Sequence, residues 1–217
     1  MAKRIFVGNK RDRMETITDL SQLDLEGRYN YADYLTWQFE QTVELIKGKI
    51  LPLAAPSRRH QGIARDLTGI FYNHFLIHHC AFYPAPFDVR LYDKRKSLKA
   101  NKDIYTVVQP DICVICDESK LDDKGCIGAP DLAVEILSPG NSKREMKTKK
   151  DLYEENQIRE YWIIDPERET AIQFVLNESA LYNPPVIYVS DEILKSAIFP
   201  QLLIPLENLF KEFRSGN

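Results

Sequence analysis

The segment PDLAVEILSP, residues 130–139, has the pattern of a buried strand with one charged residue inside it. Apolar residues surround Glu135, and a proline stands at each end of the segment. A carboxylate within an apolar strand is costly unless it is paired, bound to a cation or protonated. The segment therefore predicts a central strand and indicates Glu135 as a candidate functional residue.

The two faces of this strand differ in chemistry, because side chains alternate between them. Leu132, Val134 and Ile136 make one face wholly apolar. Glu135 lies on the other face, which it shares with Asp131. We expect the apolar face to pack against the core and the face of Glu135 to open onto a polar site.

An earlier segment, residues 105–117, predicts a second strand that carries an aspartate. Gln109, Asp111 and Cys113 share one of its faces. If the two strands are neighbours, Asp111 and Glu135 converge on one point. Two such carboxylates repel each other unless a cation lies between them. Hard oxygen ligands favour Mg²⁺ or Mn²⁺ over zinc, so we expect one of these two ions.

Residues 142–156 predict a basic helix directly after the strand of Glu135, with Ser142 as its N-cap. At 100° per residue, Leu152 and Tyr153 lie on its apolar side. Lys149 falls within the same sector, whereas Lys150 lies on its flank. A lysine facing inward beside two carboxylates could orient a water and stabilise charge that develops on a phosphate.

Each of these residues has a simpler interpretation when it is taken alone. Aspartate is common where strands begin, so Asp111 could be a turn residue. Glu135 could pair with an arginine, and Lys149 could extend its charged end into solvent. Their order and spacing together favour one common site.

The remaining elements follow from hydrophobic periodicity and turn residues. We expect helices over residues 30–42 and 58–80 and a short helix near the C-terminus. We expect two short strands within 43–53, one strand over 81–92, and a strand pair over 160–166 and 170–176. A basic loop follows residue 92. This order predicts an α/β or α+β fold with one mixed sheet.

Composition and charge exclude some classes of protein. The chain has 217 residues, of which 44% are hydrophobic and 28% charged, with a formal net charge of -3. A sizeable core can therefore form, and overall charge gives no sign of non-specific nucleic-acid binding. No apolar run is long enough to span a membrane. We expect a cytoplasmic protein in which residues 1–28 form a flexible or loosely packed extension.

Cysteines and histidines raise the question of zinc. Cys113 and Cys116 have CxxC spacing, with Cys126 nearby, but a strand would point the first two to opposite faces. We therefore expect structural thiols. His74 and His78 are four residues apart in a predicted helix, without an acidic residue placed as in a zinc-protease helix. We expect the histidines of this helix to be packed or solvated.

Six motifs together resemble the PD-(D/E)XK superfamily, and most closely its Uma-type restriction-endonuclease-like family. They are VELIKGKI, SRRH, QPDICVI, PDLAVEILSP, KKDLY and REYWIIDP. The resemblance covers residues 30–210 and implies a single domain over 29–217. It also implies a restriction-endonuclease-like core, in which helices flank a central mixed sheet of about five strands.

The resemblance assigns roles residue by residue. It implies that Asp111 and Glu135 are catalytic and hold the metal. The lysine expected two positions after the glutamate is absent, because Leu137 stands there, and Lys149 matches that lysine instead. Supporting positions that match are Glu44, His60 and Gln109. Exposed basic residues that could contact the nucleic-acid backbone are Lys143, Arg144 and Lys147.

The implied activity is Mg²⁺-dependent or Mn²⁺-dependent hydrolysis of DNA phosphodiester bonds, and analogy with the superfamily suggests a homodimer. Two other functions stay open. One is a non-enzymatic protein that uses a nuclease fold to bind nucleic acid or a partner. The other is an unrelated hydrolase that acts on a smaller phosphate ester with the same metal site.

Overall fold

A computed structural model describes residues 16–92, 100–139 and 143–211. Its centre is a six-stranded mixed sheet in which only β9 and β10 run parallel. Across this sheet the order is β12 (Val186–Tyr188), β11 (Thr170–Val175), β10 (Glu160–Asp165), β9 (Leu132–Ile136), β6 (Ile112–Ile115) and β3 (Ala81–Pro84). The mixed α/β fold expected from the sequence is confirmed.

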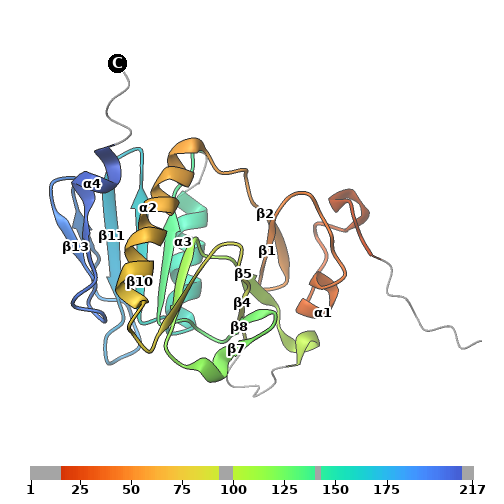
Figure 1. The fold of residues 1–217 in the computed structure, drawn as a ribbon. Helices are drawn as coiled ribbons and strands as arrows, with labels where there is room; N and C mark the ends of the chain where they lie inside the picture. The colour runs from red at the N-terminus through yellow and green to blue at the C-terminus, as the bar shows by residue number, and fades with distance from the viewer. Residues whose placement is uncertain (1–15, 93–99, 140–142, 212–217) are drawn as a thin grey trace, which may run out of the picture.

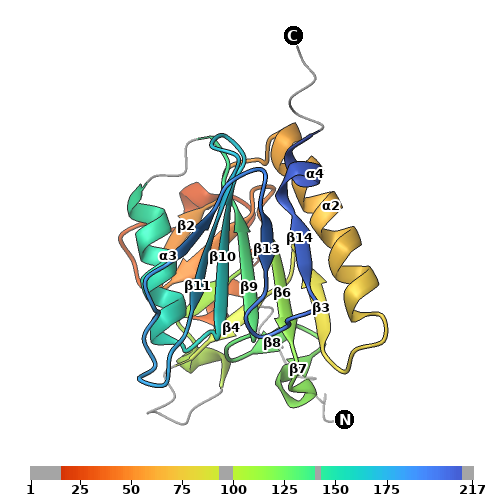
Figure 2. The ribbon, with the colours of Figure 1, turned by 90° about the vertical axis from the view of Figure 1, so that its left-hand side faces the viewer.

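The central strand β9 separates two apolar layers, as its alternation predicts. Leu132, Val134 and Ile136 belong to one hydrophobic cluster, and Ala133 belongs to another. The first cluster includes side chains of α2 (Arg58–Phe75), and the second includes side chains of α3 (Lys143–Glu155). The two helices therefore cover opposite faces of the sheet (Figure 1, Figure 2).

Helix α2 forms because its apolar residues recur at four-residue steps. Ile63, Leu67, Phe71 and Phe75 are all buried along one face. Ser57 is the N-cap of the helix, and its side chain accepts a hydrogen bond from the His60 amide. This cap places His60 in the first turn, close to the sheet. The C-terminal hairpin of β13 (Ile193–Lys195) and β14 (Leu203–Pro205) packs into the same cluster, together with α4 (Leu206–Lys211).

A second six-stranded sheet was not expected from the sequence. Its strand order is β2 (Lys49–Pro52), β1 (Val43–Ile46), β5 (Thr106–Val108), β4 (Val89–Leu91), β8 (Gly125–Ile127) and β7 (Leu121–Asp122). The expected hairpin within 43–53 is confirmed. Figure 1 shows this sheet beside the central one, with α1 (Tyr31–Tyr34) on the side of β1 that faces away from the central sheet.

Two expected strands are each divided between the two sheets. Residues 105–117 form β5 and β6, which separate at Gln109 and Pro110. Residues 81–92 form β3 and β4, which separate around the cis bond between Ala85 and Pro86. Proline cannot donate to a β-ladder, so the chain leaves one sheet and enters the other at these points. β3 is an edge strand, as its prolines suggest.

The helix expected over residues 30–42 is wrong beyond its first turn. α1 has four residues, and the following chain pairs instead with an N-terminal segment. Ile17 donates to the Thr36 carbonyl at 3.0 Å and accepts from the Gln38 amide at 2.8 Å. Part of the expected extension therefore contacts the domain. Three short 3-10 helices complete the described chain, at Leu20–Gln22, Asn101–Asp103 and Glu118–Lys120.

Cysteine chemistry corrects one expectation and supports another. Cys80 and Cys116 form a disulfide, so the prediction of a free thiol is wrong for Cys116. Cys113 and Cys126 are buried free thiols. Cys113 and Cys116 pack into different clusters, which agrees with their expected placement on opposite faces.

Three expectations fall partly outside the described residues: residues 1–15 of the extension, residues 93–99 of the basic loop, and the Ser142 cap. No described helix combines the length and apolar character that a membrane span requires.

Candidate active site

The pairing of β6 with β9 brings the two acidic positions together. The strands are antiparallel, and Ile112 lies opposite Val134. Asp111 precedes the first of these residues and Glu135 follows the second, so the two are cross-strand neighbours. Asp111 also accepts a hydrogen bond from the Ile136 amide through Oδ2 at 2.7 Å. The expected convergence of Asp111 and Glu135 is confirmed.

Lys149 reaches this point from helix α3 on the polar face of β9. Its Nζ lies 2.8 Å from Glu135 Oε1 and 2.8 Å from Glu44 Oε1. The neighbouring Lys150 points away and pairs with Glu154 one turn later, at 2.8 Å. The helical-wheel prediction that Lys149 rather than Lys150 faces inward is therefore correct.

Glu44 lies fully buried on β1 of the second sheet. Its Oε1 accepts from the Gln109 amide at 2.8 Å as well as from Lys149. Its Oε2 is buried and has no hydrogen-bond partner among the described residues. Because Lys149 bridges Glu44 and Glu135, the site joins the two sheets through one ammonium group.

Tyr153 is a member of this cluster that the sequence did not identify. It lies on α3 one turn after Lys149, and its hydroxyl donates to Glu135 Oε1 at 2.5 Å. Burial and the nearby charge of Glu135 raise its pKa well above the ordinary value, so it remains a donor. Its spacing from Lys149 was visible in the sequence, but on an apolar helix face a tyrosine looks like a core residue.

His60 approaches Asp111 from the first turn of α2. Its Nε2 lies 3.2 Å from Asp111 Oδ1, and its buried Nδ1 has no hydrogen-bond partner among the described residues. Burial acts to lower the pKa of His60, but the hydrogen bond to Asp111 and the charges of Asp111 and Glu135 raise it overall. His60 is therefore placed to orient the Asp111 carboxylate.

The other predicted residues lie around the cluster or outside it. The Gln109 side chain turns away and donates to Asp88 at 2.8 Å, so its backbone amide makes its contact with the cluster. Lys143, Arg144 and Lys147 are exposed on α3 and do not join the cluster.

Burial and the charges of the cluster shift the pKa values of both Glu135 and Lys149. Burial raises the pKa of Glu135 to about 7, and the charges of Glu44 and Asp111 add to this against the opposing effect of Lys149. Burial alone would lower the pKa of Lys149, but the two glutamates raise it. One ammonium is thus shared by two glutamates beside a third carboxylate, which leaves an excess of negative charge.

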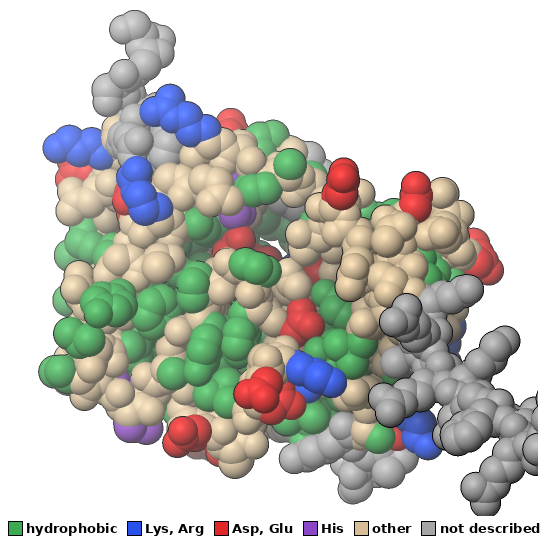
Figure 3. All heavy atoms as spheres, turned by 45° about the vertical axis from the view of Figure 1, so that its right-hand side comes forward, with side chains coloured by type: hydrophobic (Ala, Val, Ile, Leu, Met, Phe, Trp, Pro, Cys, Tyr) green, Lys and Arg blue, Asp and Glu red, His purple; other side chains and the backbone are tan. Residues whose placement is uncertain are grey.

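Solvent reaches the acidic pair. The side chains of Asp111 and Glu135 are 18% and 13% exposed, whereas that of Glu44 is 0% exposed. The space-filling view shows acidic side chains and a histidine in a recess of the surface (Figure 3). A substrate could therefore approach Asp111 and Glu135. Glu44 is buried and contacts this part of the site through Lys149.

Comparison with known proteins places the chain in a family. The model of the Uma2 family, described as "Putative restriction endonuclease", matches residues 31–207. The chain belongs to this family.

A search of curated proteins found no match. A solved structure similar to this chain is a putative nuclease belonging to DUF820 from Anabaena variabilis ATCC 29413. It is 18% identical, with a TM-score of 0.66 over 84% of this chain and 98% of its own, so it supports a nuclease-like fold.

The residues of this Uma2 chain fit a divalent cation at Asp111 and Glu135. Both offer hard carboxylate oxygens, and a cation between them would relieve the crowding of negative charge that raises the pKa of Glu135. Mg²⁺ commonly uses one or two carboxylates and keeps several waters. The two accessible carboxylates of Asp111 and Glu135 are therefore enough to hold one Mg²⁺. Glu44 would serve as a partner of Lys149 rather than as a metal ligand.

A second buried glutamate shows what a structural carboxylate looks like in the same fold. Glu160 on β10 accepts hydrogen bonds from Trp162 Nε1 at 2.7 Å and from Ser196 Oγ at 2.8 Å. The amides of Ala197 and Ile198 also donate to it. Both of its oxygens are satisfied by neutral donors, and it fastens the loop after β13 to the sheet. Glu135, by contrast, depends on a lysine and faces two other carboxylates.

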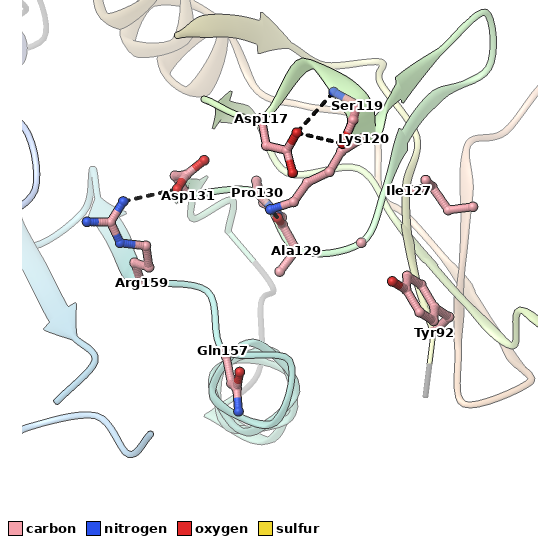
Figure 4. A pocket seen from close by; sticks show the side chains of 11 residues that line it. Tyr92, Asp117, Ser119, Lys120, Ile127, Ala129, Pro130, Asp131, Gln157 and Arg159 are labelled. Carbon is pink, nitrogen blue, oxygen red and sulfur yellow. Dashed lines mark hydrogen bonds and ion pairs between the residues drawn. The ribbon is translucent and has the colours of Figure 1, made fainter. Parts of the chain in front are cut away.

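A pocket of about 210 Å³ lies at the opposite end of β9 (Figure 4). Lys120 donates to the Ala129 carbonyl at 2.9 Å, and Arg159 pairs with Asp131 at 3.1 Å. The polar groups of this pocket thus bind one another, and it lies at the start of β9 rather than at its end. Two carboxylates and a lysine also line this pocket, but Lys120 donates to a backbone carbonyl, whereas Lys149 bridges two glutamates.

Proposed function

We propose that this protein is a divalent-metal-dependent endonuclease that hydrolyses phosphodiester bonds of DNA. The observation that supports this most is the contact of Lys149 with both Glu135 and Glu44, beside Asp111. Strands from both sheets and helix α3 contribute to this cluster. Membership of the Uma2 family supports the same conclusion.

In this proposal Asp111 and Glu135 hold Mg²⁺ or Mn²⁺. The ion, when bound, lowers the pKa of a water and neutralises charge on the phosphate. Lys149 orients that water or stabilises the negative charge that develops on the scissile group. Glu44 keeps Lys149 charged and in place.

Two further residues position the ligands rather than touch the substrate. His60 contacts the Asp111 oxygen that the Ile136 amide leaves open. Tyr153 holds the Glu135 oxygen that also faces Lys149. Oriented ligands of this kind are what a metal site needs for a fixed geometry.

The exposed basic residues at the start of α3 supply the DNA contact in this proposal. Lys143, Arg144 and Lys147 lie on the same helix as Lys149. Contacts of lysine and arginine with phosphates position a duplex without reading its sequence. Binding that depends on them should therefore weaken uniformly across DNA sequences as salt rises.

Cleavage of supercoiled plasmid and single-stranded DNA in Mg²⁺ or Mn²⁺ tests the proposal. Wild type should cleave, and Asp111→Asn, Glu135→Gln and Lys149→Met should not. Lys150→Met is the matched control, because this lysine is next along the helix and pairs outward. Nicked circles would indicate one active site per event, and linear product would support a dimer. Equal cleavage by all variants would contradict the proposal. DNA binding without cleavage in either metal would favour the non-enzymatic alternative.

A further inference from the structure

A second group of metal-type ligands lies in the connection between α2 and β3, beyond the end of α2 that is opposite to His60. His78, His79 and Cys80 each offer a ligand atom, and these atoms lie within 4.8 Å of one another. No other group of three such ligands meets this distance among the residues that the structure describes. The group is independent of the proposed nuclease site.

A candidate for a fourth ligand, Cys116, lies directly after β6, the strand that pairs with β3. Ala81 on β3 pairs with Ile115 on β6, so the preceding Cys80 faces the following Cys116. The two sulfurs form the disulfide. Cys116 Sγ is therefore bonded to one member of the group, and its release would leave a second thiol at the same place.

The two histidines already turn toward Cys80. His79 Nε2 lies 3.4 Å from Cys80 Sγ, and the His78 and His79 rings stack with centroids 4.5 Å apart. His78 Nδ1 accepts from the backbone amide of Cys80 at 3.1 Å, so Nδ1 is the unprotonated nitrogen of this ring. Replacing this hydrogen bond with a metal bond requires no change of tautomer.

Two cysteines and two histidines form a set of ligands typical of tetrahedral zinc. The sulfurs of a disulfide cannot serve, because the metal ligand is the thiolate. We propose that reduction of the Cys80–Cys116 disulfide creates a Zn²⁺ site formed by His78, His79, Cys80 and Cys116.

The chemistry of this switch balances with a dithiol as the reductant. The dithiol supplies two electrons and two protons and becomes a disulfide, while Cys80 and Cys116 become two thiols. Zn²⁺ binding then releases both protons, because the ligands are thiolates. In a cytoplasm, the location expected from the sequence, such a pair is normally kept reduced. The site would therefore be available there.

Cobalt provides a probe that distinguishes this site from the acidic cluster. The full chain is reduced, freed of reductant without oxygen, and titrated with Co²⁺ while its absorption spectrum is recorded. Thiolate ligands give sulfur-to-cobalt charge-transfer bands, which carboxylate ligands do not. We expect the reduced chain to bind about one Co²⁺ with these charge-transfer bands. Addition of Zn²⁺ should remove the bands, and the oxidised chain should not show them.

Two histidine variants make the test specific. His79→Ala removes an exposed ligand and leaves the disulfide partners intact, so the chain should fold. Loss of a metal's outer partner alone costs tenfold or more, so loss of a ligand should weaken Co²⁺ binding at least about tenfold. His74→Ala is the matched control, because His74 stacks on His78 but lies outside the group. Absence of thiolate bands in the reduced wild type, or equal affinity in His79→Ala, would overturn the proposal.

Discussion

Replacing Glu135 with glutamine should make the folded protein more stable at alkaline pH. In the wild type, the folded state raises the pKa of Glu135 from about 4.5 to about 7, because the carboxyl is buried beside Glu44 and Asp111. The folded protein therefore holds a proton that the unfolded chain has lost between these two values. The free energy of unfolding falls as pH rises through this window.

The size of the effect follows from the same two values. Each pH unit between them changes the free energy of unfolding by about 1.4 kcal/mol. Ionisation of Glu135 therefore costs the folded state on the order of 3 kcal/mol. The cost is absent below pH 4.5 and complete above pH 7. Glutamine can still accept from Tyr153 and Lys149, so the contacts of the side chain are largely kept.

Urea unfolding of wild type and Glu135→Gln at pH 5, 6, 7 and 8 measures this directly. Groups outside the cluster titrate alike in both proteins, so the difference between them reports on Glu135 and on the groups whose pKa its charge raises, such as His60. From pH 5 to pH 8 we expect the stability of the variant to rise relative to that of the wild type by about 2.5 kcal/mol. A difference that stays constant across this range would refute the charge balance assigned to the cluster.

Three other substitutions test the surroundings of Glu135. Lys149→Met should lower the free energy of unfolding by about 3–5 kcal/mol at pH 8, since it leaves Glu44 and Glu135 buried without their cation. The loss should be smaller at pH 5, where Glu135 is protonated. Urea unfolding at the two pH values measures both losses. Tyr153→Phe should cost about 1.5–3 kcal/mol through its lost hydrogen bond to a charged group, with NMR titration showing a higher pKa for Glu135. Phe71→Ala should lower the free energy of unfolding by about 3–5 kcal/mol at every pH, because it opens a cavity beneath β9.

Much of the site could be predicted because strands and helices impose simple periods on the sequence. The two-residue period of residues 130–139 placed Glu135 opposite the apolar face, and β9 confirms this. The 100° step of the helix selected Lys149 over Lys150, and the contacts of Nζ agree. These inferences depend on local geometry, which the sequence contains.

Features that depend on pairing between distant segments were missed. The disulfide requires the register of β3 against β6, which joins residues far apart in the chain. The split of residues 105–117 between two sheets depends on where Pro110 leaves the ladder. The helix predicted beyond Tyr34 is absent because Thr36 and Gln38 hydrogen-bond to Ile17, and such tertiary contacts outweigh helix propensity.

Tyr153 shows a different limit. Its position on the apolar side of α3 was evident, and it is indeed buried. Whether a buried tyrosine hydroxyl finds a partner, and which one, depends on the strand beneath it. The direct contact of its hydroxyl with Glu135 depends on how α3 packs against β9.

The central claim is that Asp111 and Glu135 hold a divalent cation. Calorimetric titration with Mn²⁺, carried out on the oxidised chain so that the cysteine site is closed, tests it most directly. We expect one Mn²⁺ site in the wild type, its loss in both Asp111→Asn and Glu135→Gln, and its retention in Lys150→Met. Mn²⁺ binding of equal affinity in all four proteins, or no binding to the wild type, would contradict the claim.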